Sequence, residues 1–290
     1  MSEQHLFCFG FGFSAQALAR RLVPKGWMVT GTARSEESFA KIADLGARPL
    51  VFDGSQAVEL PDDVTHILIS VPPDGDGDVV LRHCKQKISE RAGNLSWVGY
   101  LSTTGVYGNR DGAWVDEGAE LLPSTERGER RVKAERAWLD LYEHMDIPVM
   151  VFRLAGIYGP GRNQLVSLLK GKSRRVVKPG QVFSRIHVDD IAQILEASIE
   201  KPNPGRAYNV CDDLPAPPQD VVAFAAELMG MPPPPEVAFN EAEMSPMGRS
   251  FYAESKRVHN DRIKDELGVT LTYPDYKTGL TALFANGEVK

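Results

Sequence analysis

The 290-residue chain lacks the features that mark membrane or extracellular proteins. No apolar run reaches the ~18 residues that a membrane-spanning helix needs, and the start, Met1-Ser2-Glu3-Gln4-His5, has no basic signal-peptide region. The three cysteines, Cys8, Cys84 and Cys211, lie far apart and show no C-x-x-C spacing, which indicates reduced thiols. We therefore expect a cytoplasmic protein that does not bind a membrane.

Basic clusters and metal-ligand patterns are also missing. The formal net charge is −6, and no Lys/Arg-rich block offsets it, so the sequence disfavours nucleic acid and anionic membrane surfaces as partners. The six histidines are scattered without metal-ligand spacing, and we expect no metal site. With 42% hydrophobic and 25% charged residues, the chain is long enough for one large core and a smaller lobe. A small-molecule ligand and a monomer or homodimer are expected.

A glycine-rich turn near the start is the most informative local pattern. A short apolar run breaks into Gly10-x-Gly12-x-x-Ala15 and resumes at helical spacing, as when a buried strand turns tightly into a helix. Gly10 allows the tight turn, and Gly12 lets a pyrophosphate approach the backbone. The N–H groups of Phe13 and Ser14 open a helix whose positive end attracts phosphate. This pattern predicts a dinucleotide site that includes Ala15.

The residue that follows the second expected strand bears on the choice of cofactor. In dinucleotide-binding folds an acid about 20 residues after the glycines holds the ribose hydroxyls, whereas an arginine accommodates a 2′-phosphate. The stretch 32–35 has no acid and contains Arg34, which favours NADP, with NAD also possible. The alternative is that Arg34 is a solvated loop residue. Asp53, which ends the third strand, could meet the adenine or simply start a turn.

Strand and helix patterns alternate through the first half of the chain. Strands are expected at 27–30, 49–53, 66–71 and from 97, and helices at 14–23, 35–45, 79–92, up to 200 and at 219–229. Such alternation predicts an α/β fold with a Rossmann-type doubly wound parallel sheet and a smaller C-terminal α/β lobe. The expected division is a dinucleotide-binding domain at 1–160 and a mixed part at 161–290. In that part, 181–212 completes the sheet domain, and 161–180 with 213–290 forms the substrate lobe.

Three segments carry a resemblance to a known family. Ser102–Gly108, Arg153–Gly161 and Ile186–Ala192 resemble, in order, signatures of the extended short-chain dehydrogenases/reductases, the NAD-dependent epimerase/dehydratase family. Together with the glycine turn the resemblance covers nearly the whole chain. It implies that Ser70 and Ser102, at the carboxyl ends of neighbouring parallel strands, lie beside the cofactor.

The resemblance breaks at the family's catalytic pair, a Tyr four residues before a Lys on the helix after the fifth strand. No such pair stands in this segment. One register, which matches three flanking residues, puts Arg127 at the Tyr position and Arg131 at the Lys position. The other aligns Lys133 with the Lys and replaces the Tyr by Glu129. In both registers the phenol is absent, and the chain resembles an atypical subgroup.

Two arginines at i and i+4 on one helix face suggest a fork for a carboxylate or phosphate. A guanidinium has a pKa above ~12 and no acceptor lone pair, so Arg127 is unable to shuttle a proton near neutral pH. The alternative is a solvated ladder of ion pairs such as Glu126 with Arg130.

Other candidates lie near the same strand ends. Thr103 aligns with the family's catalytic Ser/Thr, although a threonine here could equally pack or cap. Tyr107 and Tyr158 could supply a phenol. Gly156 replaces the family's substrate-contacting Asn. His187 precedes a helix start that we expect the following Asp residues to cap.

Two functions remain open. The first is an atypical NADP(H)-dependent oxidoreductase, epimerase or dehydratase that acts on a small substrate, with an anionic substrate as one option. The second is a non-catalytic NADP(H)-binding sensor or regulator.

Overall fold

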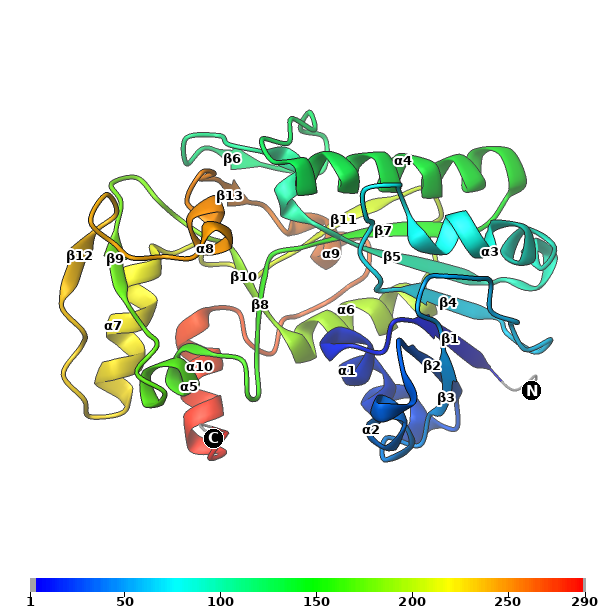
Figure 1. Ribbon diagram of the computed structural model, residues 1–290, viewed down its shortest axis with the longest axis horizontal. Helices are drawn as coiled ribbons and strands as arrows, with labels where there is room; N and C mark the ends of the chain where they lie inside the picture. The colour runs from blue at the N-terminus through cyan, green and yellow to red at the C-terminus, as the bar shows by residue number, and fades with distance from the viewer. Residues whose placement is uncertain (1–3, 289–290) are drawn as a thin grey trace.

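A seven-stranded, fully parallel sheet forms the centre of the computed structural model, which describes residues 4–288 (Figure 1). Met1–Glu3, on which part of the signal-peptide prediction rests, lie outside the described residues. The strand order is β11-β7-β5-β4-β1-β2-β3, in which the chain reverses direction across the sheet between β1 and β4. The sheet strands are β1 (His5–Phe9), β2 (Met28–Ala33), β3 (Arg48–Val51), β4 (His66–Ile69), β5 (Trp97–Thr103), β7 (Val149–Leu154) and β11 (Ala207–Val210).

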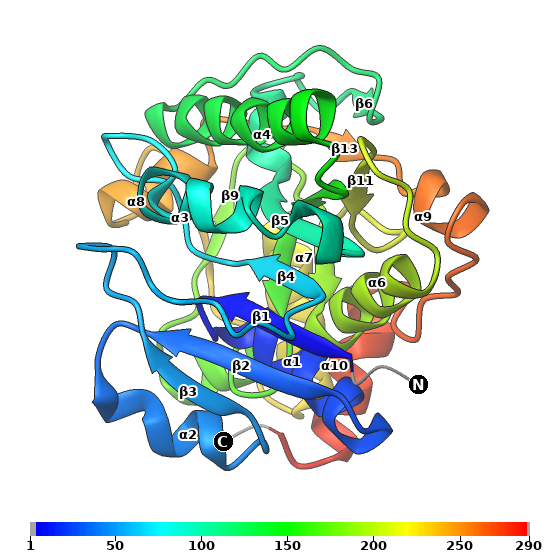
Figure 2. The same ribbon diagram turned by 90° about the vertical axis from the view of Figure 1, so that its right-hand side faces the viewer.

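Helices cover both faces of this sheet. Figure 2 shows α3 (Val79–Ser89) and α4 (Glu126–Met145) on one side, with α1 (Phe13–Leu22) and α6 (Val188–Glu200) on the other. Strand β1 explains why both faces need cover: Leu6 and Cys8 pack toward α1 and α6, whereas Phe7 and Phe9 pack toward α3 and α4. A continuous apolar run is the sequence pattern of such a doubly covered strand. The predicted doubly wound sheet is confirmed.

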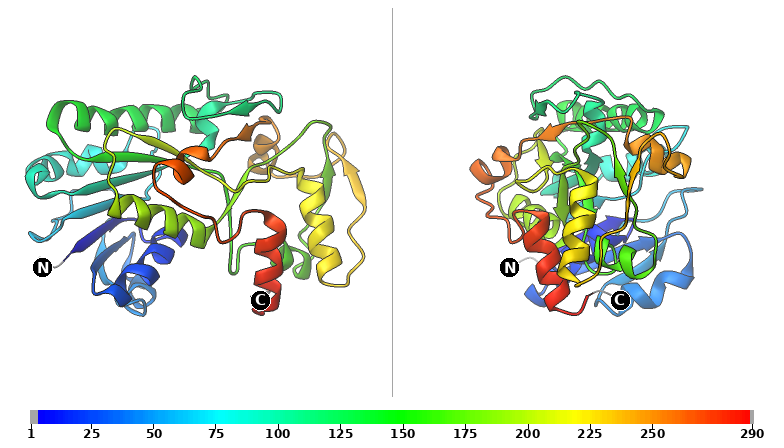
Figure 3. Two further views of the ribbon diagram at one scale, coloured as in Figure 1. Left: turned by 180° about the vertical axis from the view of Figure 1, so that it is seen from behind. Right: turned by 90° about the vertical axis from the view of Figure 1, so that its left-hand side faces the viewer.

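The smaller lobe lies beyond the carboxyl ends of the strands, with α7 in yellow and α10 in red in Figure 3. Its core is built from Leu165, Val221, Ala225 and Leu280. The lobe contains α5 (Gln164–Leu169), β9 (Arg175–Val177), α7 (Pro218–Leu228), β12 (Glu236–Ala238), α8 (Pro246–Phe251) and α10 (Tyr276–Ala285).

The structure differs from the sequence predictions in two places, one in the domain division and one in a helix. The segment 257–271 returns to the large domain, where Val258, Ile263 and Leu267 join the core of the sheet. The expected helix 35–45 is a 3-10 turn, η2 (Glu36–Ser38), followed by the short α2 (Phe39–Ala43). Short strand pairs also form outside the sheet: β8 (Gly156–Tyr158) with β10 (Arg185–His187), β9 with β12, and β6 (Trp114–Val115) with β13 (Arg257–Val258).

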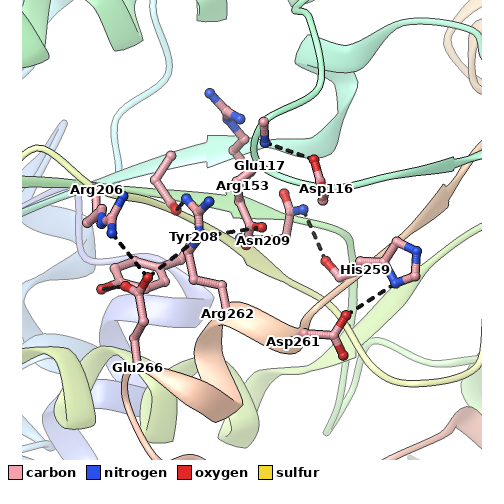
Figure 4. Close-up of polar contacts among 12 residues, drawn as sticks. Asp116, Glu117, Arg153, Arg206, Tyr208, Asn209, His259, Asp261, Arg262 and Glu266 are labelled. Carbon is pink, nitrogen blue, oxygen red and sulfur yellow. Dashed lines mark hydrogen bonds and ion pairs between the residues drawn. The ribbon is translucent and has the colours of Figure 1, made fainter.

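Side chains from the segment 257–271 and from a loop cover the backbone polar groups of the edge strand β11. The N–H of Asn209 donates to Glu117 Oε1 at 2.8 Å, and Arg262 donates to the carbonyl of Ala207 at 2.9 Å. Figure 4 shows the Asn209 amide bonded to the backbone of His259 as well. Covering the polar groups of an edge strand in this way prevents pairing with another chain. Among the described residues, no helix is long and apolar enough to cross a membrane.

Candidate functional site

The glycine turn after β1 has the geometry that a bound pyrophosphate requires. Gly10 has a positive φ of 82°, and a Cβ there would lie 3.1 Å from the side chain of Val71. Its N–H donates to Thr32 Oγ1 at 2.8 Å, which ties the turn to β2. Glycine is therefore required at this position by both the backbone conformation and the space.

Helix α1 presents an uncapped positive end beside this turn. Its N-cap is Gly12, which has no side chain to bond the first-turn N–H groups, and the first turn has no acidic residue. The nearest atom to a Cβ built at Gly12 is Ser70 Oγ, at 4.0 Å, so a ligand has room to approach the backbone. The N–H groups of Phe13, Ser14 and Ala15 stand at that end. These residues fit a dinucleotide pyrophosphate.

The two residues expected at the adenosine end differ in their surroundings. Arg34 follows β2 directly, is exposed, and makes no hydrogen bond or ion pair within residues 4–288. Its guanidinium is available for a phosphate. Asp53 instead accepts hydrogen bonds from the N–H and the Oγ of Ser55, and these bonds lower the pKa of its carboxyl group. Asp53 therefore performs the turn-starting role that the sequence left as the alternative.

A cavity of about 880 Å³ lies between the sheet domain and the smaller lobe. Its walls come from the end of β5, the start of α4, the pair β8 and β10, and the helices α5, α7, α8 and α10. Thr103 and Arg127 lie in the wall on the sheet side, and Tyr158 and Arg185 lie in the wall shared with the lobe. The carboxyl edge of a parallel sheet is where ligands bind in open α/β folds.

The charges in the cavity wall are mostly positive. Four cationic side chains, of Arg127, Arg162, Arg185 and Lys256, face one carboxylate, that of Glu254. Lys256 is paired with Glu254 at 2.6 Å and also donates to the carbonyl of Gly108 at 2.8 Å. Burial lowers the pKa of the Lys256 ammonium. The three arginines form no ion pair with a carboxylate of residues 4–288, although the chain carries a net charge of −6, so the cavity suits an anionic ligand.

Arg127 and Arg131 do not form the fork that their spacing suggested. Arg127 lines the cavity, and its guanidinium lies 5.2 Å from the ring centroid of Phe251. Arg131, one turn further along α4, donates to the carbonyl of Leu101 at 2.7 Å and to the hydroxyl of Tyr100 at 3.0 Å. Because α4 packs over β5, the second arginine reaches the sheet instead of the cavity. Only Arg127 is placed to meet a ligand there.

Ser102 and Tyr107 belong to a buried polar network beneath the cavity wall. Ser102 donates to Glu135 at 2.5 Å, and Arg153 pairs with the same carboxylate at 2.9 Å. Arg153 also donates to the hydroxyl of Tyr107 at 2.9 Å, and that hydroxyl donates to Asn209 at 2.7 Å. Burial raises the pKa of Tyr107 to about 12. The network holds β5, β7, β11 and α4 together, and neither the Ser102 hydroxyl nor the Tyr107 phenol is free for a ligand.

The remaining sequence candidates have mixed roles. Thr103 lies in the cavity wall, and its Oγ1 accepts a hydrogen bond from the N–H of Gly105 at 3.1 Å, so it caps the turn after β5. Tyr158 also lines the cavity, and burial raises the pKa of its phenol well above the usual range. His187, rather than an Asp residue, caps α6: its Nδ1 accepts from the N–H of Asp189 at 3.2 Å. The expected aspartate capping is therefore wrong.

Four charged residues of the cavity wall were missed by sequence reasoning, and one of them, Arg162, directly follows the segment Arg153–Gly161. Arg185 directly precedes the segment Ile186–Ala192, so its place beside a recognisable motif was a usable signal. Glu254 and Lys256 lie in a segment without any motif, and only the fold brings them to the turn after β5. A search for His, Cys, Asp and Glu groups that could hold a metal ion found none in residues 4–288.

Comparison with known proteins gives relatives over the whole chain. No model of a protein family matches it. The curated relative "Protein YeeZ" from Escherichia coli strain K12 is 27% identical over 279 residues, 92% of this chain and 95% of the relative. A solved structure of a functionally unknown conserved protein from Silicibacter pomeroyi is 54% identical, covers 98% of this chain and 99% of that chain, and has a TM-score of 0.92.

Two further solved structures carry informative descriptions. A putative NAD-dependent epimerase/dehydratase from Methylobacillus flagellatus is 26% identical, with 99% of each chain covered and a TM-score of 0.71. The human epimerase family protein SDR39U1 with NADPH is 18% identical, covers 98% of this chain and 99% of that chain, and has a TM-score of 0.74, which shows the shared fold. The chain is thus similar, in its sheet order, glycine turn and ordered motifs, to solved members of the extended short-chain dehydrogenase/reductase family, the NAD-dependent epimerases and dehydratases.

Proposed function

We propose that this protein binds NADP(H) along the carboxyl edge of its sheet and takes a small anionic molecule into the adjoining cavity, as an atypical oxidoreductase, epimerase or dehydratase. The observation that carries the proposal is that both sites lie at the carboxyl ends of strands of the same parallel sheet. The uncapped start of α1 suits the pyrophosphate, and the cavity opens beside Thr103 at the end of β5. The cytoplasm is the compartment we propose, because all three cysteines are free and buried.

Arg34 is the basis for proposing NADP over NAD. It is exposed at the end of β2 and makes no contact with another charged group of the described residues. A bidentate contact of a guanidinium with a phosphate is a charge-assisted hydrogen bond worth about 1.5–3 kcal/mol. The stretch 32–35 itself contains no acid that would hold the free ribose hydroxyls of NAD.

On the substrate side, the residues of this chain orient and neutralise a ligand but offer no ordinary proton relay. The nicotinamide would supply or accept a hydride when bound. Arg127 lies in the wall where the family's phenol would be, and its guanidinium stabilises negative charge without exchanging a proton at neutral pH. Thr103 Oγ1, in the same wall, retains a hydroxyl hydrogen that it can donate to a substrate oxygen.

A second candidate function is a sensor that binds NADP(H) without turnover. Two features of α4 favour it: the helix contains no Tyr four residues before a Lys, and its Arg131 donates a hydrogen bond to the carbonyl of Leu101. Single-turnover mixing of the NADPH complex with candidate substrates separates the two functions, because only the oxidoreductase loses the nicotinamide absorbance.

Calorimetric titration of the wild type and of Arg34→Ala with NADPH and NADH tests the cofactor proposal. We expect NADPH to bind the wild type about tenfold or more tighter than NADH, and Arg34→Ala to remove that preference. Arg20→Ala is the matched control, because Arg20 is also exposed and forms no ion pair among the described residues. Equal affinities of the wild type for both cofactors would overturn the assignment.

A further inference from the structure

Arg185 is a cation held rigidly in the cavity wall, and three of its five N–H donors have no partner among the described residues. Its Nη1 donates to the carbonyl oxygens of Phe183, at 2.9 Å, and Ala216, at 3.1 Å. These two bonds fix the plane of the guanidinium. Nε and Nη2 form no hydrogen bond with residues 4–288, and neither atom is completely buried. The Nε/Nη2 edge, which matches a carboxylate in a bidentate contact, therefore opens on the cavity.

No anion among the described residues neutralises this guanidinium. Asp212 is the acid whose charge acts on Arg185 most strongly, yet the two side chains form no ion pair. Within residues 4–288 both carboxyl oxygens of Asp212 are buried and accept no hydrogen bond of ordinary geometry, and burial raises its pKa well above the usual range although the backbone N–H groups of Leu214 and Arg185 act against that rise. The nearby phenols of Tyr158 and Tyr276 are neutral near pH 7, as phenols ordinarily are, and burial raises their pKa values further. A partly desolvated cation without a counter-charge is costly, and a ligand anion would remove that cost.

Gly156 leaves space directly beside Arg185. The two residues are register partners in the pair β8 and β10. A Cβ at Gly156 would lie 3.8 Å from the Arg185 Cγ and 3.3 Å from the carbonyl oxygen of Ser184. A larger side chain at this position would therefore project beside the Arg185 stem. The Oγ of Ser184, which also lines the cavity, is buried and has no partner.

The rest of the wall is largely apolar and aromatic, which decides what kind of molecule carries the anion. Around Arg185 the lobe contributes Val221, Tyr252, Tyr276 and Leu280. A guanidinium edge binds a carboxylate or a phosphate in the same bidentate way, but a dianion is costlier to desolvate among apolar side chains than a single carboxylate. An apolar body would gain about 25 cal/mol for each Å² of apolar surface that it buries here.

We propose that the Nε/Nη2 edge of Arg185 anchors the carboxylate of an apolar or aromatic monocarboxylic acid, whose carboxylate occupies the space left open at Gly156. The role of this acid as a substrate or effector of the protein rests on the proposed function. The binding itself does not depend on the cofactor.

Calorimetric titration with trans-cinnamate, its neutral amide cinnamamide and inorganic phosphate tests the proposal on the full chain. We expect cinnamate to bind, and cinnamamide and phosphate to bind at least about tenfold more weakly. Arg185→Met should weaken cinnamate binding by about tenfold or more. Gly156→Asn, which fills the space without removing the charge, should do the same. Arg136→Met changes an exposed arginine of α4 outside the cavity wall and should leave cinnamate affinity within about twofold.

Each outcome bears on a separate claim. Cinnamate binding that survives Gly156→Asn and Arg185→Met, binding of cinnamamide equal to that of cinnamate, or binding of phosphate alone would overturn the carboxylate anchor. Should Arg185→Met fail to fold, Gly156→Asn decides. NADPH titration of the same variants keeps the proposals distinguishable: NADPH binding without cinnamate binding refutes only the anchor, and the reverse refutes only the cofactor assignment.

Discussion

Removing the charge of Glu135 should be among the most damaging single changes to the fold. Glu135 is 2% exposed and Arg153 is 5% exposed, so neither charge has water to replace its partner. The carboxylate accepts from Arg153 Nη2 at 2.9 Å, from Arg153 Nε at 3.2 Å and from Ser102 Oγ at 2.5 Å. Glu135→Gln keeps the shape but leaves the buried guanidinium without a counter-charge.

The expected loss in the free energy of unfolding is about 3 kcal/mol. Breaking a buried ion pair by removing one partner costs about 3–5 kcal/mol, and the lower end applies because a Gln oxygen still accepts one hydrogen bond. Arg153 retains its bond to the hydroxyl of Tyr107, at 2.9 Å, which limits the loss further.

Urea unfolding at pH 7.5, followed by both tryptophan fluorescence and circular dichroism, measures this loss and checks for two-state behaviour. Glu126→Gln is the matched control on the same helix, because Glu126 pairs with Arg130 on an exposed face and should cost less than about 1 kcal/mol. If Glu135→Gln cost no more than Glu126→Gln, the buried network would not be what secures α4 to the sheet.

Three further predictions concern a turn, a buried histidine and the reaction. Gly108→Ala should lower the free energy of unfolding by about 2 kcal/mol or more, because φ is +68° and a Cβ would lie 1.8 Å from the carbonyl oxygen of Leu122. Thermal unfolding measures this loss. Gly161→Ala is the control, because φ is +70° there as well but the space is open. Burial lowers the pKa of His66 to about 4, so the unfolded chain, with its pKa near 6.5, takes up the proton first and stability falls as pH drops from about 6.5 toward 4. His66→Gln should reduce the loss between pH 7.5 and 5.5 by about 1 kcal/mol in urea titrations, and an unchanged loss would contradict that burial. The purified protein should not turn over UDP-sugars at rates typical of an epimerase, because α4 has no Tyr four residues before a Lys and loss of such a proton relay commonly costs 10²–10⁴-fold. Ordinary turnover in a coupled assay would refute this.

The parts of the fold that the sequence predicted are those set by local pattern. Continuous apolar runs such as Leu6–Phe9 and the glycine turn at Gly10 report burial and backbone conformation directly, and the strands they indicate are where they were expected. Strands of two or three residues, such as β6 and β13, carry too little pattern to detect. Their pairing depends on the segment 257–271 returning to the large domain, which no local signal announces.

At the candidate site, the sequence predicted the positions of residues better than the directions in which their side chains point. The position of Arg127 was correct for a cavity residue, whereas Arg131, at the same helical phase, bonds to β5 because the helix lies across that strand. Tyr107 follows β5 as expected, but its phenol points into the interior toward Arg153. The burial of Glu135, the carboxylate that orders this interior, was not predicted, because its helix is rich in charged residues. Side-chain direction depends on packing between elements, which sequence spacing alone does not encode.

The crystal structure of the NADPH complex tests the central claim most directly, through the position of the nicotinamide C4 atom. The account predicts the pyrophosphate at the N–H groups of Phe13 and Ser14, the 2′-phosphate on Arg34, and C4 facing the cavity between Thr103 and Arg127. A complex with the nicotinamide ring outside the cavity, or with the 2′-phosphate in solvent away from Arg34, would contradict it.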